Sequence, residues 1–177
     1  MKVDIDDSKD AMELFQVDVN IEEPKWSEQI NNIEIIVEKL CFAVIKEAGL
    51  LNVCSGGEVS VLLTDDKSIK KLNKQYRHHD KATNVLAFPI AEIKPSNLKS
   101  EQGKYTVLGD IIISFNTTMA EAKEQNKSFE HHFCHLIIHG ALHLLGYDHI
   151  NDKDAKAMEQ LEIKLLDKFG IVNPYSF

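Results

Sequence analysis

The chain has 177 residues, of which 44% are hydrophobic and 27% charged, and its formal net charge is −8. These values are ordinary for one globular unit, and the net charge excludes a protein that coats nucleic acid by bulk positive charge. No apolar run reaches the roughly 20 residues of a membrane-spanning helix, and the acidic start lacks the apolar core of a signal peptide. We therefore expect one cytoplasmic domain over residues 1–177, with a flexible acidic N-terminus at 1–10.

The three cysteines, Cys41, Cys54 and Cys134, are irregularly spaced and form no C-x-x-C pair. This spacing favours neither a disulfide framework nor a thiolate zinc site. We expect buried thiols in a reducing compartment.

Strand and helix patterns alternate in the first third of the chain. Residues 15–21 alternate apolar and polar side chains and predict a strand. From Ser27 to Gly49 the apolar residues recur at spacings of three and four, which predicts one amphipathic helix capped by Ser27. Residues 58–64 predict a second strand.

A basic helix is expected next, capped by Asp65 or Asp66. Its apolar face would carry Ile69, Leu72 and Tyr76, and we expect Tyr76 in the core rather than as a platform for stacking a base. The densest positive stretch of the chain lies here, at Lys67, Lys70, Lys71, Lys74, Arg77 and Lys81. Taken alone, such a stretch is most often a solvated helix face.

The remaining elements complete an interleaved pattern. Strands are expected at 84–89 and 107–114, a loop at 91–105, and helices at about 115–126, 128–145 and 152–169. The sequence therefore predicts an α/β (α+β) fold, in which about five helices pack on one small mixed β-sheet.

Three histidines close to the end of the helix at 128–145 suggest a metal site. His139 and His143 are four residues apart, so their side chains lie about 40° apart around a helix and converge on one point. Gly146 can adopt the left-handed conformation that ends a helix, and His149 follows within reach of the first two. Three imidazoles bind zinc and leave one position for a water of lowered pKa or for a phosphate oxygen.

Neighbouring residues leave alternatives open at this point. His135 and His139 have the same spacing and could form a competing pair, and otherwise His132 and His135 are surface or supporting residues. Asp148 either orients a ligand imidazole or starts the next turn. Three imidazoles also suit nickel, copper or iron.

The spacing H-x-x-x-H-x-x-G-x-x-H resembles the metal helix of zinc metallopeptidases, whose second position is a glutamate. Here that position is Gly140. The glutamate is the general base of those enzymes, and glycine cannot accept a proton. Peptidase chemistry by that route is therefore not expected, although a zinc-dependent hydrolase of peptides or amides stays as an alternative.

The stretch "HGALHLLGYDH" is instead similar to the signature of the YbeY family of metal-dependent endoribonucleases. Residues 72–89, "LNKQYRHHDKATNVLAFP", and 108–113, "LGDIII", resemble two further motifs of that family in the expected order. The departures are Ala82, where the family has proline, and Ala87, where it has serine.

This resemblance implies that His139, His143 and His149 hold one zinc ion, and that Arg77 and His139 are the catalytic residues. It also implies single-stranded RNA as substrate, namely the 3′ end of a 16S ribosomal RNA precursor, with the small ribosomal subunit as partner and no membrane or DNA partner. A guanidinium suits the extra negative charge of a phosphodiester under attack. A third reading is a non-catalytic ribosome-assembly factor in which the zinc is structural.

Four residues around these motifs have smaller expected roles. His78 and His79 could shuttle protons or form an exposed pair in a loop. Asp80 and Thr83 are expected to shape the turn after the basic helix. Asp110 either supports the metal helix from the sheet or is an exposed carboxylate on a strand.

Overall fold

A computed structural model describes residues 13–176, so the expected acidic N-terminus at 1–10 lies outside the described residues. The strands are β1 (Phe15–Ile21), β2 (Gly56–Thr64), β3 (Val85–Pro89) and β4 (Tyr105–Ser114). The α-helices are α2 (Lys25–Gln29), α3 (Ile33–Glu47), α4 (Asp66–Arg77), α5 (Phe115–Glu124), α6 (Phe129–Leu144) and α7 (Asp152–Asp167). Short 3-10 turns lie at Leu50–Asn52 and Leu98–Glu101, the second inside the expected loop.

The four strands form one mixed sheet in the order β1-β2-β4-β3. β1, β2 and β4 are parallel, whereas β3 runs antiparallel to β4. This arrangement confirms the predicted α/β fold with one small mixed sheet. It also leaves β1 and β3 as the two edge strands, at opposite sides of the sheet.

The expected single helix from Ser27 to Gly49 is wrong, because the chain breaks it between α2 and α3. Asn32 adopts a left-handed conformation with φ 53°, and Ser27 lies inside α2 instead of capping a helix. Trp26 explains the break: it is fully buried, and its indole nitrogen donates to the Thr64 carbonyl oxygen at 3.1 Å. The split accounts for six α-helices where about five were expected.

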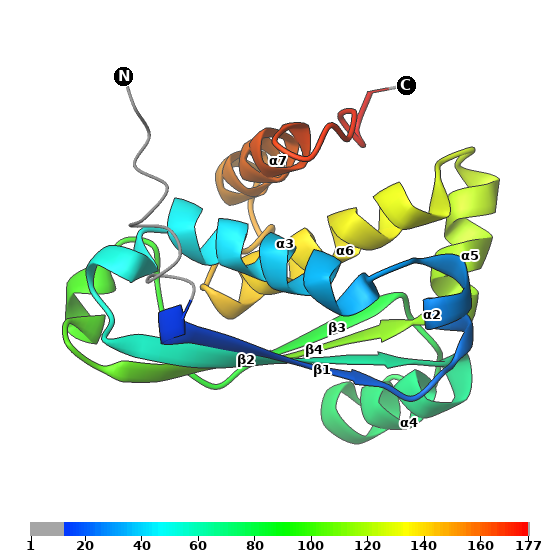
Figure 1. Cartoon of the computed structure of the whole chain (residues 1–177), viewed down its shortest axis with the longest axis horizontal. Coiled ribbons are helices and arrows are strands. Elements are labelled where there is room, and N and C mark those ends of the chain that lie inside the picture. Colours follow the sequence, from blue (N-terminus) through cyan, green and yellow to red (C-terminus); the bar gives the residue numbers. More distant parts are fainter. Residues whose placement is uncertain (1–12, 177) are drawn as a thin grey trace.

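Helices cover the two faces of the sheet unequally (Figure 1). α3 and α6 lie on one face with α7 outside them, whereas α4 lies on the other face. The main core fills the first side, and a smaller core of Ile69, Leu86 and Ile112 lies under α4. The Asp65 side chain accepts from the Ser68 amide at 2.8 Å, so it is the cap of α4.

One expectation about the α4 side is wrong, and one alternative left open there is decided. Tyr76 is 59% exposed, because it packs against Phe88 on the edge strand at 5.4 Å between ring centroids and leaves its outer side to solvent. Asp110 lies in a hollow with Leu72 and Tyr76 on the α4 side. It therefore does not support α6, which contacts the neighbouring Ile111 from the opposite face.

The three cysteines are free and buried, as expected. Burial raises the pKa of the Cys41 thiol and, with the nearby Glu130, that of Cys134, each to about 12. Within residues 13–176, none of the helices has the length and the hydropathy needed to cross a membrane.

Candidate active site

α6 presents two of the predicted metal ligands side by side. The helix begins after Ser128, whose hydroxyl accepts from the His131 amide, and its apolar residues are buried against the sheet and α3. The Nε2 atoms of His139 and His143 lie 3.1 Å apart, and both side chains are partly buried. The i, i+4 spacing thus converges as predicted.

A left-handed turn brings the third histidine back. Gly146 has φ +81°, and a Cβ atom there would lie 2.1 Å from the carbonyl oxygen of Ile93. The amides of Gly146 and Tyr147 donate to the carbonyls of His143 and Leu142, each at 3.1 Å, which closes the end of the helix. The sequence predicted this turn, but not its close contact with Ile93 in the loop that follows β3.

The three histidines fit a metal ion. The ring of His149 lies 5.7 Å from that of His139 and 5.0 Å from that of His143, and one donor atom from each residue lies within 4.8 Å of the others. Zinc–nitrogen bonds of about 2.0–2.1 Å at a tetrahedral ion place two nitrogens about 3.3 Å apart. The nitrogens of His139 and His143 already have nearly this separation, and a nitrogen of His149 lies within 4.8 Å of both.

The protonation state of His143 suits the same purpose. Burial, with the neighbouring His139 and His149, lowers the pKa of His143 to about 4. The imidazole is therefore neutral at pH 7, which is the form that donates a lone pair to a metal.

Sequence reasoning missed a buried carboxylate behind these histidines. Glu162 on α7 is 1% exposed and accepts from His139 Nδ1 at 2.5 Å, from His135 Nε2 at 3.3 Å and from the Tyr175 hydroxyl. Burial would raise the pKa of Glu162, but the donors of His135 and His139 lower it to about 2. The sequence does contain a sign of this buried carboxylate, because Glu162 interrupts the apolar stripe that Met158 and Leu165 form on α7.

The other histidines of α6 have different partners. The Nε2 atom of His135 faces Glu162, and its Nδ1 atom is buried and has no hydrogen-bond partner among the described residues. His132 lies further back, with Nε2 2.8 Å from Glu121. His135, His139 and Glu162 also place one donor atom each within 4.8 Å of one another, so this second group stays as an alternative to His139, His143 and His149.

Arg77 lies at the same cavity as the three histidines. The cavity has a volume of about 350 Å³ and is lined by Arg77, Asn84, Val85, Ala87, His139, Gly140, His143, Asp148 and His149. Arg77 ends α4, and its Nη2 atom donates to the Ala87 carbonyl oxygen at 3.1 Å. A guanidinium has five N–H donors, so this bond leaves donors for an anion in the cavity.

Two polar residues of the cavity are held in place by hydrogen bonds. The Asn84 amide donates to Glu121 at 3.0 and 3.2 Å, and its oxygen accepts from the Val85 amide at 2.7 Å. Sequence reasoning did not single out Asn84, although it lies within the second family-like motif. The Asp148 side chain accepts from the His149 amide at 2.7 Å, so it starts the turn, which was one of its two expected roles.

The basic segment lies largely outside this cavity. Lys70 and Lys74 form ion pairs with Asp80, at 3.8 and 2.9 Å. His78 ends α4 in a left-handed conformation with φ 60°, and both His78 and His79 are exposed. Asp80 thus shapes the end of α4, and the two histidines fit an exposed pair.

The structure gives a packing reason for glycine at position 140. A Cβ atom there would lie 2.9 Å from the Cγ2 atom of Ile111. α6 therefore lies close against β4 at this point, and a glutamate could not be accommodated without movement of the core.

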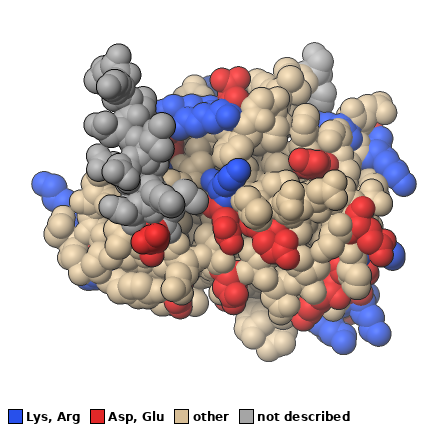
Figure 2. Space-filling model, viewed as in Figure 1, with Lys and Arg blue, Asp and Glu red and all other residues tan. Residues whose placement is uncertain are grey.

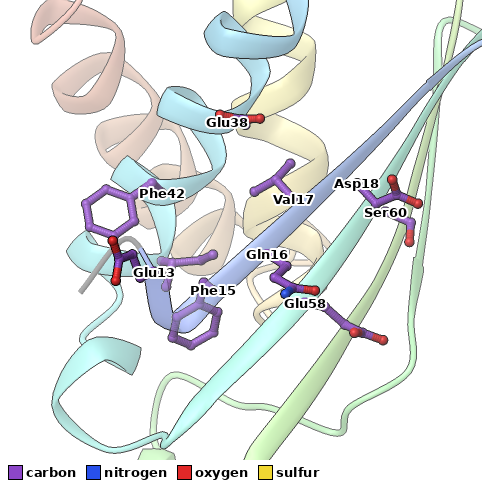
Figure 3. Close-up of a pocket in the computed structure, with 10 residues that line it drawn as sticks. Glu13, Phe15, Gln16, Val17, Asp18, Glu38, Phe42, Glu58 and Ser60 are labelled. Carbon is purple, nitrogen blue, oxygen red and sulfur yellow. The ribbon is translucent and has the colours of Figure 1, made fainter. Parts of the chain in front are cut away.

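A larger cavity lies at the opposite edge of the sheet, along β1. It has a volume of about 570 Å³, and four of its ten lining residues are acidic: Glu13, Asp18, Glu38 and Glu58 (Figure 3). Acidic side chains also gather on the surface around β1 and α3 (Figure 2). Among the described residues, neither histidine nor a basic side chain lines this cavity, so it suits neither a metal–imidazole site nor a phosphate.

Comparisons with known proteins agree with the motifs. The family model described as Endoribonuclease YbeY matches residues 18–170. A relative from Bartonella bacilliformis named Endoribonuclease YbeY is 39% identical over 163 residues, which cover 92% of this chain and 98% of the relative. Another of that name, from Sinorhizobium fredii, is 46% identical over 118 residues, which cover 67% of this chain and 65% of the relative.

A solved structure is also similar. The solution structure of TM1509 from Thermotoga maritima matches with a TM-score of 0.56 and 28% sequence identity, over 86% of this chain and 88% of that one. With the family model spanning most of the described residues and relatives of this identity, the chain belongs to the YbeY family of endoribonucleases and is an RNA-hydrolysing enzyme.

Proposed function

We propose that the chain is a zinc-dependent endoribonuclease specific for single strands, with one zinc ion held by His139, His143 and His149. The observation that carries the proposal is the 3.1 Å separation of the Nε2 atoms of His139 and His143, with His149 completing the set. A zinc ion held there would supply a Lewis acid beside the scissile phosphate.

Arg77 and the histidines have different roles: Arg77 contacts the phosphate of the substrate, and the histidines bind the metal. Arg77 donates to the non-bridging oxygens of the phosphate, where negative charge increases as phosphorus gains a fifth ligand. His139 acts as a metal ligand whose lone pair on Nε2 is free because its Nδ1 atom faces Glu162. The cavity of about 350 Å³ holds both groups at the β3 edge of the sheet.

A single strand suits this cavity better than a duplex. A lone backbone enters a narrow cleft without unwinding, and its phosphates reach the arginine and the metal ligands that line the cavity. From the family resemblance we further propose that the substrate is the 3′ end of a 16S ribosomal RNA precursor. The same resemblance supports work in ribosome quality control, with the small ribosomal subunit as partner in the cytoplasm.

The test is a cleavage assay with three substrates and a controlled metal. Purified protein, first treated with a chelator and then given back zinc, is offered single-stranded RNA, duplex RNA and a peptide. We expect cleavage of the single strand alone, lost with the chelator and restored by zinc.

Other outcomes would contradict the proposal. RNA cleavage that survives complete metal removal would exclude the metal-dependent mechanism. Peptide cleavage would favour the amide-hydrolase reading, and one tightly bound zinc without turnover would favour the assembly factor.

A further inference from the structure

The carboxylate of Glu162 lies in an unusual place. It is 1% exposed on a face of α7 that otherwise buries apolar residues such as Met158 and Leu165. A buried carboxylate costs free energy unless several donors surround it, and an apolar residue would pack there at less cost. A function for the charged group itself explains why the position is not apolar.

The three donors around Glu162 come from two segments of the chain. They are His139 Nδ1 at 2.5 Å and His135 Nε2 at 3.3 Å, both on α6, and the hydroxyl of Tyr175 from the C-terminal segment. An ionised carboxylate only accepts hydrogen bonds, so the proton of a neutral His139 must sit on Nδ1. The lone pair of His139 then lies on Nε2, the atom that faces His143.

The C-terminal segment closes the other side of this carboxylate. The Tyr175 ring packs edge-on against His135 at 5.6 Å between centroids. Ile171 is buried, and Lys127 Nζ donates to the Pro174 carbonyl oxygen at 2.9 Å, so the segment is held at two points before Tyr175. The hydroxyl of Tyr175 therefore reaches Glu162 from a held position.

We infer that Glu162 and Tyr175 are positioning residues of the metal site: together they fix the ring and the tautomer of His139 so that its Nε2 atom is presented to the metal. His135 belongs to the same group of positioning residues, because its Nε2 atom donates a hydrogen bond to Glu162. The inference rests on the proposed metal site and adds α7 and the C-terminal segment to it. Carboxylates that orient ligand imidazoles in this way contribute about 10–100-fold to metal affinity.

The test measures metal affinity directly, in the full chain and without RNA. Zinc binding is followed by competition with a chromophoric chelator for the wild type, Glu162→Gln, Tyr175→Phe and Glu47→Gln. Glu47 is the matched control, because its carboxylate also holds α7, through Lys164 and Lys168, and makes no hydrogen bond to a histidine among the described residues.

We expect Glu162→Gln to bind zinc about 10–100-fold more weakly. Tyr175→Phe should show a smaller loss, and Glu47→Gln should bind within twofold of the wild type. In the metal-free wild type, NMR of ¹⁵N-labelled histidine should place the His139 proton on Nδ1.

Wild-type affinity in Glu162→Gln, an equal loss in Glu47→Gln, or a His139 proton on Nε2 would overturn the inference. If Glu162→Gln does not fold, Tyr175→Phe decides: weaker binding supports the inference and unchanged binding overturns it. A wild type that binds no metal would instead overturn the proposed function, so the two failures are distinguishable.

Discussion

The two edges of the sheet carry cavities of opposite character. At the β3 edge, a cavity of about 350 Å³ brings together three histidines and an arginine, whereas at the β1 edge a larger one of about 570 Å³ is lined by four carboxylates. Of these two cavities, the larger one lacks the groups that the proposed chemistry needs. Electron-pair donors and a cation are what a metal ion and a phosphate need, and only the smaller cavity offers both.

The largest effect that would sharpen this contrast is the loss of a ligand. We expect His143→Ala to lose its bound metal and to lower the rate of RNA cleavage by more than about 10³-fold, because the stabilisation supplied by a metal amounts to several kcal/mol. Elemental analysis and a cleavage assay measure both. His131→Ala, an exposed histidine of the same helix, should leave both unchanged. Metal retained together with full cleavage would contradict the assignment.

Arg77→Ala should have the next largest effect. Removing a donor to developing negative charge lowers kcat by about 10²–10³-fold, and the metal content should not change, because Arg77 contacts Ala87 rather than a histidine. Single-turnover cleavage measures the rate, and elemental analysis measures the metal content. Lys71→Ala removes a charge from the same helix outside the cavity and should cost little. Equal losses in the two variants would point to general attraction of RNA instead.

A stability effect should follow from the close packing of α6 on β4. In Gly140→Glu the added Cβ would meet Ile111 at 2.9 Å. We expect the free energy of unfolding to fall by about 1–2 kcal/mol, since overpacking outweighs the better helix propensity. Urea unfolding of the variant and the wild type measures this difference in the free energy of unfolding. Gly140→Ala adds only the Cβ, and a gain in its stability would show that the helix has more room than the structure indicates.

The smallest effect is expected at the β1 edge. Glu38→Lys reverses an exposed charge of the acidic cavity, and cleavage of a short single-stranded RNA should stay within twofold of the wild type. Steady-state kinetics at about 0.15 M ionic strength test this. A tenfold change in either direction would mean that the acidic edge takes part in substrate binding, and the contrast between the edges would fail.

The parts of the site that the sequence predicts are those that depend on local geometry. His139 and His143 share one helical face, and Gly146 turns the chain within three residues, so their convergence follows from helix periodicity and a single turn. Arg77 entered through a motif resemblance, and its distance from the histidines depends on how α4 packs across the sheet edge.

The parts that the sequence could not predict depend on contacts between distant segments. Glu162 reaches His139 only because α7 packs on α6; periodicity marks a carboxylate within an apolar stripe but does not name its partner. The break between α2 and α3 follows from the burial of Trp26 against Thr64, not from a helix-breaking residue. Tyr76 was misplaced because its apolar spacing does not tell where the sheet ends.

The short span of the three histidines also affects how a metal would act on stability. His139, His143 and His149 lie within eleven residues, so they stay near one another in the unfolded chain, and a metal ion would bind there too, more weakly. Binding to the unfolded chain subtracts from the stabilisation that the affinity of the folded state implies. The contact of Gly146 with Ile93 and that of Glu162 with His139 exist only after folding, so the preference of the ion for the folded chain arises from tertiary contacts of this kind, not from the histidine spacing.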